Sequence, residues 1–182
     1  AMVVHGFGNT IPATNEMMVT HLRAVSNGAP DKFVIGDFPF LSNRKGITFS
    51  METADRLMKA GAQAVKIEGF KGNEKVIQSL VEAGVPVMGH LGLTPQSVHA
   101  LGGFQVQARK GKAADRLLAE SKALEDLGCF GIVLEAIPVD VARRVTEVLE
   151  IPTIGIGAGP YTSGQVLVLQ DLLGMDLLMS IL

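Results

Sequence analysis

Cysteine, long apolar runs and an excess of either charge are all scarce in this 182-residue sequence. The single cysteine, Cys129, excludes an internal disulfide and favours a reducing compartment. We expect it to be a buried, unreactive thiol, because it opens the apolar run LGCFGIVLE. Sixteen basic residues nearly balance 18 acidic ones. No basic stripe indicates nucleic acid or an anionic membrane as a partner.

No segment of about 18 apolar residues is present, so we expect no membrane-spanning helix. The first residues, AMVVHGFGN, lack the basic stretch and apolar segment of a secretory signal peptide. Both observations favour a soluble protein of the cytoplasm. Hydrophobic residues make up 47% of the sequence and charged residues 19%, which indicates a globular domain and not a disordered chain.

Apolar segments of strand length alternate with segments of helical periodicity. We predict strands at 32–40, 64–69, 85–92, 130–136 and 151–159, and a short sixth strand near 166–170. Helical patterns cover 12–30, 51–62, 73–84, 112–128 and 138–150, and Gly61 and Gly84 stand where helices commonly end. Repeated strand–helix units predict an α/β fold with a parallel sheet and right-handed crossovers.

The polar residues of the predicted strands distinguish an open doubly wound sheet from a (β/α)8 barrel. Asp37, Lys66 with Glu68, His90 and Glu135 each fall near the C-terminal end of a strand. Barrel enzymes collect site residues there from several strands, whereas an open sheet concentrates its site at one switch point. We therefore predict a (β/α)8 TIM barrel forming a single domain over residues 1–182. A barrel usually needs about 250 residues, so we expect this domain to be truncated at both ends.

The segment AVKIEG (64–69) places Lys66 and Glu68 on one face of an otherwise apolar strand. A structural salt bridge would explain this pair alone, but the other strand-end groups favour a site. Asp37 and Glu68 are hard oxygen ligands suited to Mg²⁺, and Lys66 could neutralise a substrate carboxylate. Burial among Ile132–Leu134 should raise the pKa of Glu135, which suits a general base. The alternative for Glu135 is a helix-capping or loop-tying carboxylate.

Three further features allow more than one interpretation. His90 is either a hydrogen-bonding residue at the mouth of the site or a satisfied loop histidine. The GIGAG segment (155–159) lacks the G-x-G-x-x-G spacing of a dinucleotide site and favours close backbone approach at a strand end. In the long stretch 89–111, Thr94 and Pro95 predict the start of a short helix. Gly102 and Gly103 then begin either a lid or a subunit-contact loop.

Seven segments resemble, in order and spacing, the ketopantoate hydroxymethyltransferase family: GDFPF, VKIEG, GHLGLTPQS, GGFQVQ, VLEAIP, IPTIGIGAG and GQVLVLQDLLG. The resemblance covers essentially the whole chain. It implies a (β/α)8 barrel of the phosphoenolpyruvate mutase and isocitrate lyase superfamily. It also implies Mg²⁺-dependent hydroxymethyl transfer from 5,10-methylenetetrahydrofolate to 3-methyl-2-oxobutanoate, giving 2-dehydropantoate for pantothenate and coenzyme A. A cytoplasmic homo-oligomer, commonly a decamer, is the expected state.

The same resemblance implies roles for individual residues. Asp37 resembles a metal-binding and substrate-contacting aspartate, Glu68 the second metal carboxylate, and Lys66 the lysine that contacts the ketoacid. Glu135 resembles the proton acceptor, and His90 the histidine beside the bound product.

The resemblance is incomplete at the N-terminal side. The family pattern has a preceding strand that ends in Gly-Asp-Ser and supplies another metal ligand and a substrate-contacting serine, and the sequence does not contain it. Two alternatives stay open: a carbon–carbon lyase of the same superfamily, whose Lys-Lys-Cys-Gly-His loop is not visible, and a non-catalytic truncated fragment.

Overall fold

The computed structural model describes residues 2–109 and 111–174, which are built around one parallel sheet of six strands. The strands are β1 (Ile35–Asp37), β2 (Ala64–Glu68), β3 (Val87–Gly92), β4 (Gly131–Glu135), β5 (Thr153–Ile156) and β6 (Gly164–Gln165). Their order in the sheet is their order in the chain. A doubly wound sheet would reverse this order at a switch point, so the arrangement is that of a barrel wall and confirms the predicted α/β class.

The sixth strand lies earlier in the chain than the sequence predicts. Gly164 and Gln165 pair with β5, and the Val166 N–H donates to the Gly155 carbonyl at 3.0 Å. Residues 157–163 join the two strands without a helix. The apolar run that begins at Val166 suggested a strand at 166–170, but it leaves the sheet and enters the short helix α8 (Leu169–Leu172). The prediction of a strand at 166–170 is therefore wrong, while the first five predicted segments each contain an observed strand.

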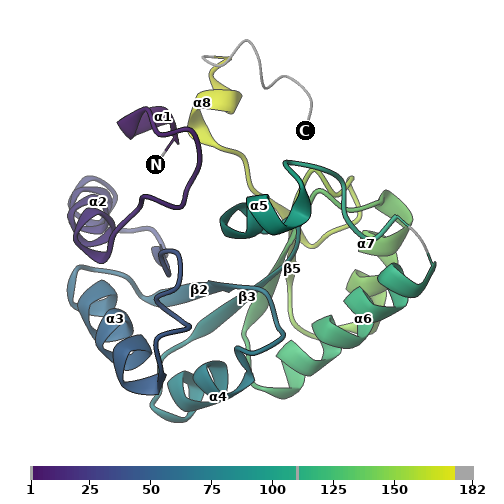
Figure 1. Cartoon of the computed structure of the whole chain (residues 1–182), viewed down its shortest axis with the longest axis horizontal. Helices are drawn as coiled ribbons and strands as arrows, with labels where there is room; N and C mark the ends of the chain where they lie inside the picture. The colour runs from purple at the N-terminus through teal and green to yellow at the C-terminus, as the bar shows by residue number, and fades with distance from the viewer. Residues whose placement is uncertain (1, 110, 175–182) are drawn as a thin grey trace.

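Five helices wrap the outer face of the sheet, as Figure 1 shows: α2 (Asn15–Gly28), α3 (Ile47–Lys59), α4 (Glu74–Glu82), α6 (Gly111–Asp126) and α7 (Val139–Val148). The short helices α1 (Met2–His5) and α8 lie near one another at the top of that view. A 3₁₀ turn, η1 (Pro95–Ser97), and helix α5 (Val98–Leu101) follow β3.

Local signals explain where several of these elements begin and end. The hydroxyl of Thr14 accepts a hydrogen bond from the Met17 N–H at the start of α2. Gly61 and Gly84 follow the C-terminal residues of α3 and α4 with φ of 110° and 82°, so their predicted positions are confirmed. Thr94 and Pro95 begin η1 as predicted, although the Thr94 side chain makes no capping bond.

Successive residues of each strand alternate between the helices and the interior of the curved sheet. The outward strand side chains are fully buried: Val65, Ile67, Val87, Ile132 and Leu134. They form one core with fully buried residues of the helices: Leu57, Ile77, Leu80, Leu124 and Val145. Each buried aliphatic side chain of this kind contributes about 1.5–3 kcal/mol to folding. Cys129 lies in the same core, so its expected burial is confirmed, and burial raises the pKa of its thiol to about 12.

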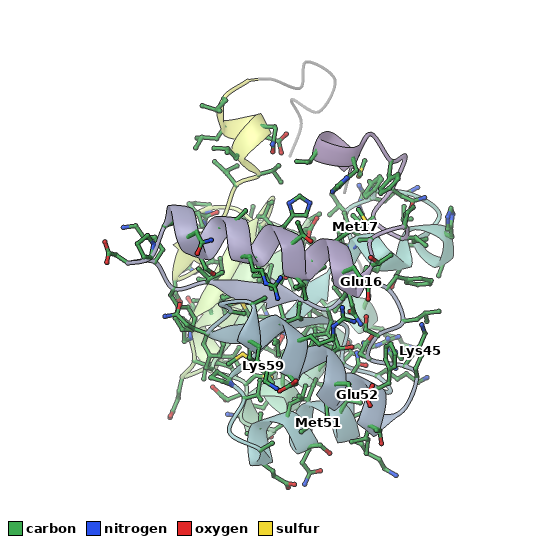
Figure 2. All side chains as sticks on the ribbon, turned by 90° about the vertical axis from the view of Figure 1, so that its left-hand side faces the viewer. Glu16, Met17, Lys45, Met51, Glu52 and Lys59 are labelled. Atoms are coloured by element: carbon green, nitrogen blue, oxygen red, sulfur yellow. The ribbon has the colours of Figure 1, made fainter. Side chains whose placement is uncertain are left out.

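The surface formed by α2 and α3 is polar. Glu16 of α2 pairs with Arg56 of α3 at 2.9 Å, and Asn15 donates a hydrogen bond to Thr53 at 3.1 Å. Figure 2 views the molecule from this side and labels Glu16, with Glu52 and Lys59 of α3. These contacts join two neighbouring helices on the outside of the sheet. The candidate site lies on the opposite, interior face.

The apolar residues after β6 are exposed where the structure describes them: Leu172 and Leu173 are 64% and 63% exposed. The remainder of that leucine- and methionine-rich segment, 175–182, lies outside the described residues. Across residues 2–109 and 111–174, no helix combines the length and the apolar character needed to span a membrane.

Candidate active site

The interior face of the sheet lines a cavity of about 810 Å³. The inward side chains of the strands line it: Ile35, Asp37, Lys66, Glu68, Met88, His90, Val133, Glu135, Ile154 and Ile156. Its size is within the range of small-molecule sites, which commonly combine apolar walls with a few converging polar groups. Lys66 and Glu68 share this interior face, as their spacing predicts, and the polar residues of the neighbouring strands lie on it too.

Strand register brings the five predicted polar residues to one end of this cavity. Asp37 of β1 lies opposite Lys66 of β2, and Glu68 of β2 lies opposite His90 of β3. Glu135 of β4 lies opposite Gly92, two residues beyond His90. Four consecutive strands thus present their C-terminal ends to the same space, which is where barrel enzymes hold their catalytic groups.

Lys66 is the central cation of the site. Its Nζ lies 3.1 Å from Oδ1 of Asp37 and 3.5 Å from Nδ1 of His90. Burial alone would lower the pKa of Lys66, but the carboxylates of Asp37, Glu68 and Glu135 outweigh it and leave this pKa raised. Lys66 is therefore a stable ammonium at neutral pH.

Glu68 is held by backbone as well as by charge. Its Oε2 accepts a hydrogen bond from the Gln96 N–H at 3.0 Å, and its Oε1 lies 4.0 Å from Nδ1 of His90. Burial raises the pKa of Glu68 although His90 and Lys66 act in the opposite direction. An additional cation near this carboxyl group would favour its ionised form.

His90 and Glu135 face one another across β3 and β4. Nε2 of His90 lies 3.1 Å from Oε2 of Glu135, yet the two atoms are not aligned for a hydrogen bond, and within the described residues this buried nitrogen has no hydrogen-bond partner. Burial, with the charge of Lys66, lowers the pKa of His90 to about 4, so the ring is neutral at pH 7. Burial also raises the pKa of Glu135 to about 7, as the sequence predicts for a general base.

The donor set of the site fits a hard divalent cation. Three carboxyl groups, those of Asp37, Glu68 and Glu135, face one ammonium, and the imidazole is neutral. Within 2–109 and 111–174, no three histidine, cysteine or acidic residues lie close enough to hold a metal by themselves. Mg²⁺ is usually coordinated by one or two carboxylates, with water and substrate in its other positions. Asp37 and Glu68 are the predicted carboxylate pair.

Two residues with amide side chains, Asn73 and Gln96, form hydrogen bonds that hold the site in place, and the sequence did not predict them. Asn73 is fully buried, and its Nδ2 donates to the carbonyls of Glu68 and Gly69 at 2.9 and 2.8 Å. Its Oδ1 accepts from Asn43 Nδ2 at 2.8 Å, which joins the loop after β1 to the end of β2. Gln96 is the second missed residue and lines the cavity itself.

Glycines allow two close backbone approaches around the site. Gly92 has φ of 93°, and a Cβ there would overlap the carbonyl oxygen of Glu135. In the GIGAG segment, Gly159 has φ of 77° and a Cβ would lie 2.7 Å from Val139. This packing confirms the close approach predicted for the segment.

The stretch after β3 lies against the end of β4. Gly102 ends α5 in the left-handed conformation, and the Gln107 N–H donates to the Ala136 carbonyl at 2.8 Å. Whether Gly102, Gly103 and the residues after them act as a lid or as a subunit contact stays a prediction.

Comparisons with known proteins show which sequences this chain resembles. A family model described as "Ketopantoate hydroxymethyltransferase" matches residues 1–179. A 3-methyl-2-oxobutanoate hydroxymethyltransferase of Coxiella burnetii (strain RSA 493 / Nine Mile phase I) is 58% identical over 177 residues, covering 97% of this chain and 66% of the relative. One of Bdellovibrio bacteriovorus is 55% identical over 176 residues, covering 97% of this chain and 67% of the relative. The chain thus spans about two thirds of the length of the relatives it matches.

Solved structures with low identity show the fold. A 2,3-dimethylmalate lyase, described as a PEP mutase/isocitrate lyase superfamily member, has a TM-score of 0.60 at 19% identity, covering 90% of this chain and 60% of its own. A phosphonopyruvate hydrolase in complex with oxalate and Mg²⁺ has a TM-score of 0.65 at 11% identity, covering 91% of this chain and 64% of its own. The likeness shows that the chain shares the fold of these proteins over about 90% of its length.

Proposed function

The chain belongs to the ketopantoate hydroxymethyltransferase family, and on this premise we propose that it carries most of the catalytic groups for hydroxymethyl transfer to 3-methyl-2-oxobutanoate. The one-carbon donor in this proposal is 5,10-methylenetetrahydrofolate, and the product is 2-dehydropantoate. The observation that carries the proposal is the convergence of Asp37, Lys66, Glu68, His90 and Glu135 on one cavity.

Asp37 and Glu68 would hold Mg²⁺, because they are the two oxygen-ligand side chains on adjacent strands and their surroundings carry excess negative charge. Bound there, the ion would supply Lewis-acid chemistry that makes the C3 proton of a 2-oxo acid easier to remove. Lys66 would pair with the substrate carboxylate, since its ammonium is stable at neutral pH and lines the cavity.

Glu135 would take the proton from C3. Its raised pKa of about 7 matches a base that works near neutrality, and its side chain is only 14% exposed. The C3–H bond breaks as the proton passes to Glu135, and the electron pair left on C3 forms the new bond to the one-carbon unit. As this bond forms, the bond from the one-carbon unit to one folate nitrogen breaks, and that nitrogen keeps the electron pair and takes a proton. Water then supplies the hydroxyl oxygen as the second carbon–nitrogen bond breaks, so that the hydroxymethyl group stays on C3 and tetrahydrofolate, protonated on that nitrogen, leaves.

His90 would contact the substrate or product through Nε2. We assign the proton of the neutral ring to Nε2, because Nδ1 lies 3.5 Å from the Lys66 ammonium and could accept from it. A buried N–H with no aligned partner among the described residues is suited to donate to a ligand oxygen. The apolar walls formed by Met88, Val133 and Ile154 would surround the branched hydrocarbon end of the ketoacid.

A carbon–carbon lyase is the second candidate that the sequence left open, but its support is weaker. The hydroxymethyltransferase relatives are 55–58% identical over nearly the whole chain, whereas the dimethylmalate lyase is 19% identical. Similarity at that level shows a shared fold and does not indicate which reaction the protein catalyses. A homo-oligomeric state and a cytoplasmic location belong to the proposal through the same family membership.

The test is the reaction of the complete protein that contains this chain. With Mg²⁺, 3-methyl-2-oxobutanoate and 5,10-methylenetetrahydrofolate, liquid chromatography with mass spectrometry should detect 2-dehydropantoate. Parallel incubation with 2-methylisocitrate should yield no cleavage products. Cleavage of the tricarboxylate without hydroxymethyl transfer would reassign the protein to the lyases.

A further inference from the structure

Gln96 makes two hydrogen bonds that reach different strands of the site. Its backbone N–H donates to Oε2 of Glu68 at 3.0 Å, and its side-chain Nε2 donates to the carbonyl of Phe38 at 2.7 Å. Phe38 directly follows Asp37 at the end of β1. Gln96 therefore contacts the surroundings of both carboxylates to which the metal site is assigned.

These bonds span a gap that the sheet does not close by itself. Gln96 follows β3, and β3 pairs with β2 but not with β1. The Gln96 side chain thus connects the loop after β3 to the end of β1, passing over the end of β2. Phe38 is buried and Gln96 is half-buried, so the bond is partly shielded from competition with water.

We propose that Gln96 is a positioning residue that orients Glu68 and fixes the end of β1, so that Glu68 and Asp37 present oxygens to one divalent cation. The Gln96 N–H occupies Oε2 of Glu68 and leaves Oε1 for the cation or substrate. That N–H stays in place because the side-chain amide anchors its loop to Phe38. The inference rests on the proposed function, which assigns the cation to this carboxylate pair.

A methionine in place of Gln96 removes the side-chain donor and keeps approximately its length. In the complete protein, Gln96→Met should weaken binding of Mn²⁺, used as a spectroscopic substitute for Mg²⁺, by about tenfold, because partners that orient metal ligands commonly contribute 10–100-fold. Electron paramagnetic resonance of free Mn²⁺ measures this affinity without relying on turnover. Steady-state kinetics of the same variant should show a lower kcat.

Gln78→Met is the matched control, because Gln78 is an exposed residue of α4 whose amide pairs with Glu82. It should leave Mn²⁺ affinity unchanged. A Gln96→Met protein with wild-type Mn²⁺ affinity would overturn the inference, whether or not its melting temperature falls, since a purely structural role predicts lower stability alone. If wild-type protein binds no Mn²⁺ and transfers no hydroxymethyl group, the proposed function fails instead, and the two failures are distinct.

Discussion

Nε2 of His90 lies 3.1 Å from Oε2 of Glu135, so a neutral imidazole and a carboxyl group with a raised pKa face each other across two strands. In the described part of the chain, no lysine or arginine forms an ion pair with Glu135. Burial therefore determines the pKa of this carboxyl group, with Lys66 only partly offsetting it. Glu135 differs in this respect from Asp37, which pairs directly with Lys66 at 3.1 Å.

The raised pKa of Glu135 predicts how removal of the C3 proton depends on pH. The ionised carboxylate is the base, so kcat/KM for exchange at C3 should rise as pH increases through about 7 and then level off. Proton NMR of the ketoacid in buffers between about pH 5.5 and 8.5 measures this rate. A rate that does not change over this interval would contradict the assignment of Glu135 as the base.

Glu135→Gln should abolish exchange at C3 while Mn²⁺ still binds, because Asp37 and Glu68 remain. The substitution should also change how stability depends on pH. The folded-state pKa of Glu135 is raised from 4.5 to about 7, so the folded state retains a proton that the unfolded state releases in this interval. As pH rises from 4.5 to about 7, the free energy of unfolding of metal-free wild-type protein should therefore fall relative to that of Glu135→Gln. Urea denaturation at several pH values measures the difference, and exchange retained by the variant would assign the base elsewhere.

Lys66→Met removes the ammonium that faces Asp37 and, in the proposal, the substrate carboxylate. The KM for 3-methyl-2-oxobutanoate should rise roughly tenfold or more, since hydrogen bonds to charged groups contribute about 1.5–3 kcal/mol. Steady-state kinetics measure the effect. Lys59→Met is the control, because Lys59 is an exposed lysine of α3 paired with Asp55. An unchanged KM in Lys66→Met would show that Lys66 serves only the ion pair with Asp37.

Gly92→Ala tests the close packing of β3 against β4. At φ of 93° an alanine is strained, and its Cβ would overlap the Glu135 carbonyl oxygen. Strain of this kind costs about 1–3 kcal/mol, and relieving it would displace the Glu135 backbone. Urea denaturation should show the loss of stability, and activity should fall. Gly28→Ala at the end of α2, where a Cβ meets nothing within 4 Å, is the control and should lower neither stability nor activity. A fully stable and active Gly92→Ala protein would refute this role of Gly92.

Much of the site could be predicted because strand geometry is periodic. Lys66 and Glu68 share a face, and parallel strands end at one edge, so pattern alone placed them with Asp37, His90 and Glu135. The sixth strand was misplaced because an apolar run such as Val166–Leu169 has the composition of a strand, while the residues that pair are Gly164 and Gln165.

The supporting amides were missed for a different physical reason. Gln96 bonds to the Phe38 carbonyl, 58 residues away in the chain, and Asn73 bonds to the backbone carbonyls of Glu68 and Gly69 at the end of β2. Such contacts depend on how loops meet in space and leave no periodic signal in the sequence. Asn73 also stands directly before α4, where an asparagine looks like an N-cap, although its side chain makes no capping bond.

Deuterium incorporation at C3 is the most direct measurement of whether these groups act together. The complete protein, incubated with Mg²⁺ and 3-methyl-2-oxobutanoate in D₂O without folate, should replace the C3 proton at a rate well above that of buffer. Loss of the C3 proton signal in the NMR spectrum is the predicted result. Exchange no faster than in buffer, from protein shown to be folded and to bind the metal, would contradict the account.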